Sequence, residues 1–173
     1  MTQFKIISSH SFCERRMHNS NGSNYIASLK NYKKNQVITS FAPATVAVEP
    51  TYLTIQMSMG HHITLHPEFL QYINHSCDPN VFFNTSTMQL VAVKKIIPED
   101  KITTFYPSTE WDMTQTFHCY CDTEKCIDAI KGAAYLPKEL RSEYAFNNFI
   151  KQQFAKKWAT DSGNYNLERP LLF

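Results

Sequence analysis

Three cysteines, Cys119, Cys121 and Cys126, stand within eight residues of the chain. The short spacing allows one tight loop to bring all three thiols to a single point. Zn²⁺ in a structural site takes four ligands in a tetrahedron, so this cluster requires a fourth ligand from elsewhere. The candidates are Cys77, Cys13, His118 and His75. The alternative interpretation is that these cysteines are small buried apolar side chains, as free cysteines often are.

The total of five cysteines is odd, so they cannot all pair as internal disulfides. The first residues contain no apolar segment that ends in a small-residue cleavage site, so no secretion signal is visible. No stretch approaches the roughly 18 apolar residues of a membrane-spanning helix. We therefore expect an intracellular protein, cytoplasmic or nuclear, without a membrane partner. In such a reducing compartment, clustered cysteines are more often metal ligands than disulfides.

Short runs of Val, Ile, Thr and aromatic residues alternate with prolines and turn signals along much of the chain. They predict strands over residues 36–41, 44–49, 52–57, 81–84, 88–97 and 102–106, and a helical turn over 66–72. From Leu136 to Trp158 the apolar residues approximate helical spacing, and Pro137 suits a first helical turn. The sequence therefore predicts a mostly β fold with a C-terminal helix.

The charge of the chain is nearly balanced. Its 17 basic and 15 acidic residues leave a net charge of +2, and no long basic run is present. Proteins held to nucleic acid mainly by charge carry a pronounced basic patch or stripe. This balance argues against a zinc-stabilised nucleic-acid-binding domain, and we expect no direct nucleic-acid partner.

Three motifs occur in a characteristic order. Tyr-Ile-Asn-His-Ser-Cys-Asp-Pro-Asn at 72–80 is followed by Ile-Thr-Thr-Phe-Tyr at 102–106 and then by the cysteines at 119–126. In order and approximate spacing, these motifs resemble a SET domain with its post-SET segment. SET domains are lysine methyltransferases that use S-adenosylmethionine. The resemblance implies a SET-domain β-clip of short curved sheets with a pseudoknot, a zinc-bound post-SET loop and a C-terminal helix. The chain is then divided into a SET domain at 1–116, a post-SET zinc segment at 117–133 and a C-terminal helical extension at 134–173.

The resemblance also implies a role for particular residues. Tyr106 is the expected catalytic residue, placed at the end of the lysine channel to orient the amine or the methyl group. One structural zinc ion is expected on Cys77, Cys119, Cys121 and Cys126. The residues expected to bind S-adenosylmethionine are Gly22, Ser23, Asn24, Tyr25, Gln71, Asn74, His75, Tyr106, Phe117 and Ile130.

Three positions depart from the family pattern. Asn24 stands where a second glycine is usual, Gln71 where many relatives have an arginine, and Phe105 where an acid usually precedes the tyrosine. These departures favour a catalytically inactive SET-like binding or scaffold module. The motif at 72–80 and Tyr106 favour an active protein-lysine N-methyltransferase, which is the function we predict. Its partner is expected to be a protein that bears a lysine, a histone among others, and the C-terminal helix offers a surface for an oligomer.

Overall fold

The computed structural model describes residues 3–165, with side chains as far as Trp158. Within this range the chain forms short strands, four 3₁₀ helices and one α-helix. The strands are β1 (Phe4–Ser9), β2 (Cys13–His18), β3 (Asn24–Ser28), β4 (Val37–Ser40), β5 (Ala42–Ala47), β6 (Ile55–Ser58), β7 (His61–His66), β8 (Asn74–His75), β9 (Val81–Asn84), β10 (Gln89–Ala92), β11 (Lys101–Thr104), β12 (Phe117–His118) and β13 (Ala129–Ile130). The helices are η1 (Glu68–Tyr72), η2 (Tyr106–Ser108), η3 (Ala133–Tyr135), η4 (Glu139–Ser142) and α1 (Asn148–Tyr165). The predicted mostly β fold with a C-terminal helix is confirmed.

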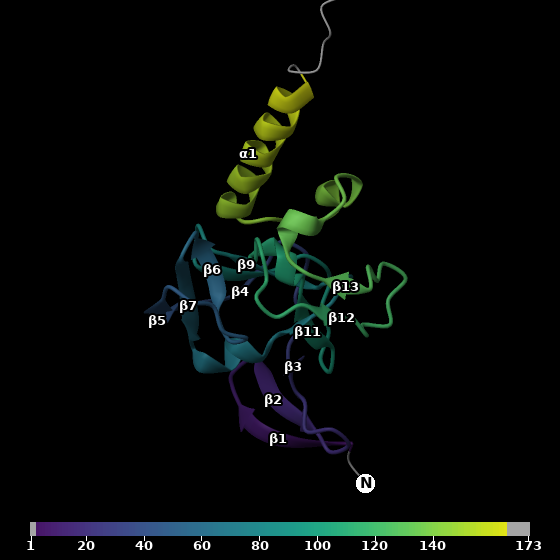
Figure 1. Ribbon diagram of the computed structural model, residues 1–173. Helices are drawn as coiled ribbons and strands as arrows, with labels where there is room; N and C mark the ends of the chain where they lie inside the picture. The colour runs from purple at the N-terminus through teal and green to yellow at the C-terminus, as the bar shows by residue number, and fades with distance from the viewer. Residues whose placement is uncertain (1–2, 166–173) are drawn as a thin grey trace, which may run out of the picture.

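The largest sheet has eight strands in the order β1-β2-β3-β11-β9-β10-β4, with β8 also paired to β11 (Figure 1). Strand β11 occupies the middle and pairs with three separate parts of the chain. Ile102 lies opposite Ile26 of β3 in an antiparallel pair, while Thr104 pairs in parallel with both His75 of β8 and Val81 of β9. The motif at 72–80 is therefore held on both sides of its turn by the strand that leads directly to Tyr106. The pseudoknot itself stays a prediction.

A second sheet, in the order β5-β7-β6, lies beside the first (Figure 1). Its inward side chains, which include Ile55, Ile63 and Leu65, share one apolar core with buried residues of the large sheet such as Leu90 and Ile102. Helix η1 follows β7 directly and adds Leu70 to this core. The small sheet and η1 therefore pack on the large sheet through one shared core, and η1 leads directly into the 72–80 motif.

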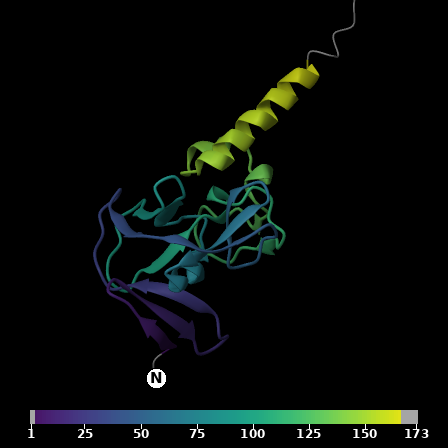
Figure 2. The same ribbon diagram turned by 90° about the vertical axis from the view of Figure 1, so that its left-hand side faces the viewer.

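The C-terminal part adds a two-stranded sheet, β12-β13, and a second apolar cluster. In this cluster Phe105 packs with Leu136, Phe146 and Ile150, so the segment that follows the cysteines is fixed to the end of β11. Beyond this contact α1 projects away from the sheets in both views (Figures 1 and 2). No helix in the described range is both long and apolar enough to cross a membrane. Residues 166–173 of the predicted extension lie outside the described residues.

Several predicted boundaries were wrong. The C-terminal helix begins at Asn148 and not near Leu136, because the apolar residues of 136–147 enter the second cluster from turns and from η4. The strand predicted over 52–57 begins at Ile55, since a turn in which the Thr54 amide donates to the Thr51 carbonyl precedes it. The strand predicted over 88–97 ends at Ala92. The strand over 81–84 and the helical turn after Pro67 formed as predicted.

Candidate active site and metal site

The four predicted zinc ligands converge. The sulfur atoms of Cys77, Cys119, Cys121 and Cys126 all lie within 4.8 Å of one another. The sulfur atoms of Cys77 and Cys119 are 3.8 Å apart. Four thiolates around one Zn²⁺ at a Zn–S distance near 2.3 Å would stand about 3.8 Å apart, so the donor set fits such an ion. Of the other candidates for the fourth ligand, Cys13 is buried in β2, outside this group.

Burial affects the thiols of this cluster unequally. Burial raises the pKa of Cys77 to about 11 and also raises that of Cys119. At Cys121 burial acts in the same direction, but hydrogen bonds outweigh it, including one with the Thr123 hydroxyl at 3.2 Å, and the pKa falls to about 6. Since metal ligation requires thiolates, metal binding at this cluster should release protons from the two buried thiols.

His75 connects the cysteine cluster to Tyr106. Its Nδ1 accepts a hydrogen bond from the Tyr106 backbone amide at 3.2 Å, and its Nε2 lies 3.3 Å from the Cys77 sulfur. Burial lowers the pKa of His75 to about 4, so the ring is neutral near pH 7. A neutral ring that accepts at Nδ1 carries its proton on Nε2, which therefore points a donor at the sulfur.

Tyr106 lies between this histidine and a cavity of about 370 Å³. Its hydroxyl donates a hydrogen bond to the Ile73 carbonyl at 3.3 Å. Burial raises the pKa of Tyr106 to about 12, so the side chain is a neutral hydrogen-bonding group. Residues of the small sheet, η1 and the segment after β11 line the cavity, among them Tyr52, Ile55, Leu65, Leu70, Gln71, Ile73, Phe83, Thr104, Tyr106, Glu110 and Phe117.

The predicted cofactor residues of the first motif lie at the start of β3. The Asn74 side-chain amide donates to the Asn24 carbonyl at 2.7 Å, which joins this segment to the 72–80 motif. Gly22 has a positive φ of 70°. Asn24, which stands where relatives usually have a second glycine, has no positive φ. Instead Asn24 begins a strand, and its side chain accepts a hydrogen bond from Arg15. The side chain of exposed Ser23 donates to Asn21.

Tyr25 is packed inside the N-terminal sheet. It is 6% exposed, and its ring is stacked on His18 with the centroids 4.5 Å apart. The amine of Lys101 lies over the same ring. The structure therefore separates Tyr25 from the cavity beside Tyr106.

Three other predicted cofactor residues lie near Tyr106. Gln71 lines the cavity and donates from its amide to the Leu65 carbonyl at 3.0 Å. Phe117 places its ring edge-on to Tyr106, with the centroids 6.0 Å apart, and pairs across β12-β13 with buried Ile130. The predicted residues thus form two groups, one around Tyr106 and one at the start of β3, joined through the neighbouring residues 74 and 75.

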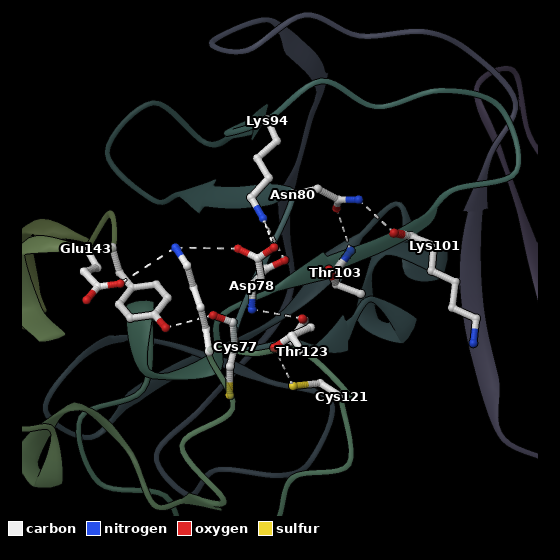
Figure 3. Close-up of polar contacts among 12 residues, drawn as sticks. Cys77, Asp78, Asn80, Lys94, Lys101, Thr103, Cys121, Thr123 and Glu143 are labelled. Atoms are coloured by element: carbon white, nitrogen blue, oxygen red, sulfur yellow. Dashed lines mark hydrogen bonds and ion pairs between the residues drawn. The ribbon is translucent and has the colours of Figure 1, made fainter.

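A polar network links the C-terminal segment to the cysteine cluster (Figure 3). Asp78 forms ion pairs with Lys94 and, at 3.8 Å, with Lys125. Lys125 also lies 3.8 Å from a carboxylate oxygen of Glu143. In the adjacent contact, the Tyr144 hydroxyl donates to the Cys77 carbonyl at 2.8 Å. The segment beyond the cysteines therefore contacts the turn that carries Cys77 directly.

Residues 3–107 match the family model of the SET domain. The chain belongs to the SET domain family. Its relatives include methyltransferase flvH of Aspergillus flavus, with 36% identity over 127 residues, 72% of this chain and 70% of that protein. A SET and MYND domain-containing protein of Dictyostelium discoideum is 39% identical over 67 residues, 33% of this chain and 20% of that protein. These matches confirm the family predicted from the motifs.

Among solved structures, this SET domain is similar to the methyltransferase domain of the human histone-lysine N-methyltransferase SETMAR. The TM-score is 0.47 with 15% sequence identity. The match covers 75% of this chain and 58% of that domain's chain.

Glu110 was not among the site residues predicted from the sequence, although it lies only four positions after Tyr106. Glu110 lines the cavity. Its Oε1 accepts hydrogen bonds from the Gln56 backbone amide at 2.9 Å and from the Thr109 hydroxyl at 3.0 Å. Burial raises the pKa of Glu110 to about 7. The available signal was the position of an acid only four residues after the motif tyrosine.

Proposed function

We propose that this SET domain transfers a methyl group from S-adenosylmethionine to the side-chain amine of a lysine in a protein substrate, a histone or another protein. The observation that carries the proposal is the position of Tyr106. Tyr106 lines a cavity whose walls are mostly apolar, and its backbone amide donates to His75 of the 72–80 motif. Membership in the SET family supports the same reaction.

The residues around Tyr106 suit a direct displacement. When bound, S-adenosylmethionine supplies an electrophilic methyl group on a sulfonium. The reaction forms a nitrogen–carbon bond as the carbon–sulfur bond breaks, and it needs a neutral amine in line with the methyl group. Tyr106 is uncharged and partly buried, so its part is to orient a group by hydrogen bonding. Alignment and exclusion of water then provide most of the acceleration.

The metal part of the proposal is a structural zinc ion held by Cys77, Cys119, Cys121 and Cys126. Four thiolates leave no open position for a reactive water, so the ion would stabilise structure and would not act on the substrate. Because Cys77 belongs to the motif and the other three belong to residues 117–133, the ion would fix the post-SET segment beside Tyr106. The division into 1–116, 117–133 and 134–173 belongs to this proposal, as does an oligomer formed through α1.

A catalytically inactive binding module is the second candidate, and two observations favour it. Asn24 forms no left-handed turn at the first motif, and its side chain is engaged by Arg15. The amide of Gln71, where many relatives have an arginine, is engaged by the Leu65 carbonyl. Both features leave fewer free groups to hold the cofactor's methionine portion.

Two measurements on the zinc-loaded chain distinguish these candidates. Isothermal titration with S-adenosylmethionine should show one binding site, and absence of binding would refute the enzyme. Incubation with labelled cofactor and a mixed protein substrate should label lysines. Tyr106→Phe should lower that rate about 100-fold, because the amine loses its orienting hydroxyl.

A matched control for this experiment is Tyr120→Phe. Tyr120 is 86% exposed and does not line the cavity. The substitution therefore removes the same hydroxyl group from a tyrosine outside the cavity. Its rate should stay within twofold of the native rate. An equal loss in both variants would show that Tyr106 has no special part in the reaction.

A further inference from the structure

The cavity beside Tyr106 carries charge of one sign. Among the residues that line it, the acidic side chains are Glu110 and Asp112, and no lysine, arginine or histidine is present. Asp112 is exposed to solvent, and its Oδ1 already accepts a hydrogen bond from the Tyr135 hydroxyl. Glu110 is the more buried of the two carboxylates. An anionic ligand would therefore be repelled in this cavity, and a cation would be attracted.

Glu110 has one carboxylate oxygen available to a ligand. Its Oε1 is held by the Gln56 amide and the Thr109 hydroxyl, and the Gln56 side chain in turn accepts from the Trp111 amide at 2.9 Å. These bonds fix the carboxylate in place. No donor among the described residues bonds its second oxygen, Oε2. The side chain is thus anchored on one oxygen and free to accept a hydrogen bond on the other.

A buried hydroxyl in the same cavity also lacks a partner. Thr104 of β11 is 5% exposed, and its Oγ1 has no hydrogen bond to any described residue. Buried polar groups are nearly always hydrogen-bonded, so an unsatisfied one calls for an explanation. Since Thr104 lines the cavity, a bound ligand with a polar end offers one.

The remaining walls suit an alkyl chain that ends in a cation. Leu65, Leu70 and Ile73 are buried apolar residues that border the cavity. The aromatic rings of Phe83 and Tyr106 lie in the same lining. Apolar walls bury methylene groups, and aromatic faces attract ammonium ions.

We propose that Glu110 is the residue that binds the ammonium group of an alkylamine ligand in this cavity, and so determines the specificity of the site for cations. The proposal rests on the proposed function and deepens it, because it names the side chain that selects an amine as it enters. The bound ammonium must then give up its proton before the methyl transfer, which uses the neutral amine. Glu110 offers the charge, Thr104 a second polar contact, and the apolar walls the space for the methylene chain.

The test compares a cation with a neutral molecule of the same size. Zinc-loaded chain labelled with ¹⁵N is titrated at pH 8 with n-butylamine, which is protonated there, and separately with 1-butanol. Butylammonium should shift the amide signals of Thr109 and Glu110 and bind at least tenfold more tightly than butanol. Glu110→Gln keeps an oxygen for the Gln56 and Thr109 donors and should abolish that preference. Asp112→Asn, which removes the exposed carboxylate, should retain it.

The proposal is overturned if butanol binds the native chain as tightly as butylammonium, or if Glu110→Gln keeps the preference. Should that variant not fold, the ¹³C shift of the Glu110 carboxyl in the native chain serves instead, and an unchanged shift at saturating butylammonium overturns the proposal. These outcomes are separable from those for the proposed function. Glu110-dependent binding in a chain that takes up no S-adenosylmethionine supports this inference and refutes the enzyme. Lysine labelling without a cation preference supports the enzyme and refutes this inference.

Discussion

Tyr106 stands between two regions that differ in how they are built. On one side is the thiol wall, made of His75 and the four clustered cysteines. On the other is the cavity wall, made of Gln56, Thr109 and Glu110. The thiol wall consists of motif residues that bond to one another, whereas the cavity wall consists of residues outside any motif. In our proposals the thiol wall holds Tyr106 in place and the cavity wall selects the ligand.

Metal removal should have the largest effect, and it should be confined to the thiol wall. A chelator is expected to increase hydrogen exchange over residues 117–132 and to abolish binding of S-adenosylmethionine. The β core, which packs apart from the four clustered cysteines, should keep its far-ultraviolet circular dichroism. Binding that survives chelation would contradict a role for metal in holding this wall. Cys13→Ser is the matched control, and it should still bind one zinc ion per chain.

The cavity wall should respond to pH. The pKa of Glu110 is about 7 in the folded chain against an ordinary value of 4.5, and burial is the main cause. Between these values the folded state binds more protons at this residue than the unfolded state, so its contribution to the free energy of unfolding falls as pH rises. Urea unfolding of the native chain and of Glu110→Gln from pH 4.5 to 8 measures this directly. The stability of the variant relative to the native chain should rise across that range, and parallel curves would contradict the assignment.

A smaller effect is expected where the C-terminal segment contacts the thiol wall. Tyr144→Phe removes the hydroxyl that donates to the Cys77 carbonyl but keeps the ring that stacks on Phe105, with centroids 3.8 Å apart. The free energy of unfolding should fall by about 1 kcal/mol, the net value of one hydrogen bond. Urea unfolding of the zinc-loaded chain measures the change. Unchanged stability would show that this contact adds nothing to the wall.

The smallest effect is expected for the surface ion pairs next to the thiol wall (Figure 3). Lys125 lies 3.8 Å from both Asp78 and Glu143, and its side chain is 53% exposed. Lys125→Ala should therefore cost less than about 1 kcal/mol, as exposed ion pairs usually do. The difference from the native chain should shrink further in 1 M salt, because salt screens exposed charges. A larger, salt-independent loss would mean that Lys125 stabilises the cysteine loop by packing.

The sequence was informative where short spacing determines the geometry. Three cysteines within eight residues can converge in few ways. Cys77 was assigned to the same group because it lies in the 72–80 motif, and its sulfur does lie with the other three. Glu110 was not predictable in the same way, because its anchoring amide belongs to Gln56, 54 residues away. The conformation of Asn24 was also set from outside the local sequence, through Arg15 and Asn74. The helical periodicity after Leu136 predicted the start of the C-terminal helix too early. The apolar residues of the turns before α1 pack in the same cluster as those of α1, so they mimic helical spacing.

The pairing of β11 has a consequence for the order in which the protein is made. This strand pairs with segments near residues 26, 75 and 81, so these three pairings cannot form until the ribosome has released residues 101–104. Contacts between such distant segments form slowly, because the ends of long loops must meet first. The N-terminal hairpin β1-β2 can form early, but the groups around Tyr106 must be assembled late in synthesis. The cavity and the cysteine cluster beside Tyr106 therefore cannot form until most of the described chain has been synthesised.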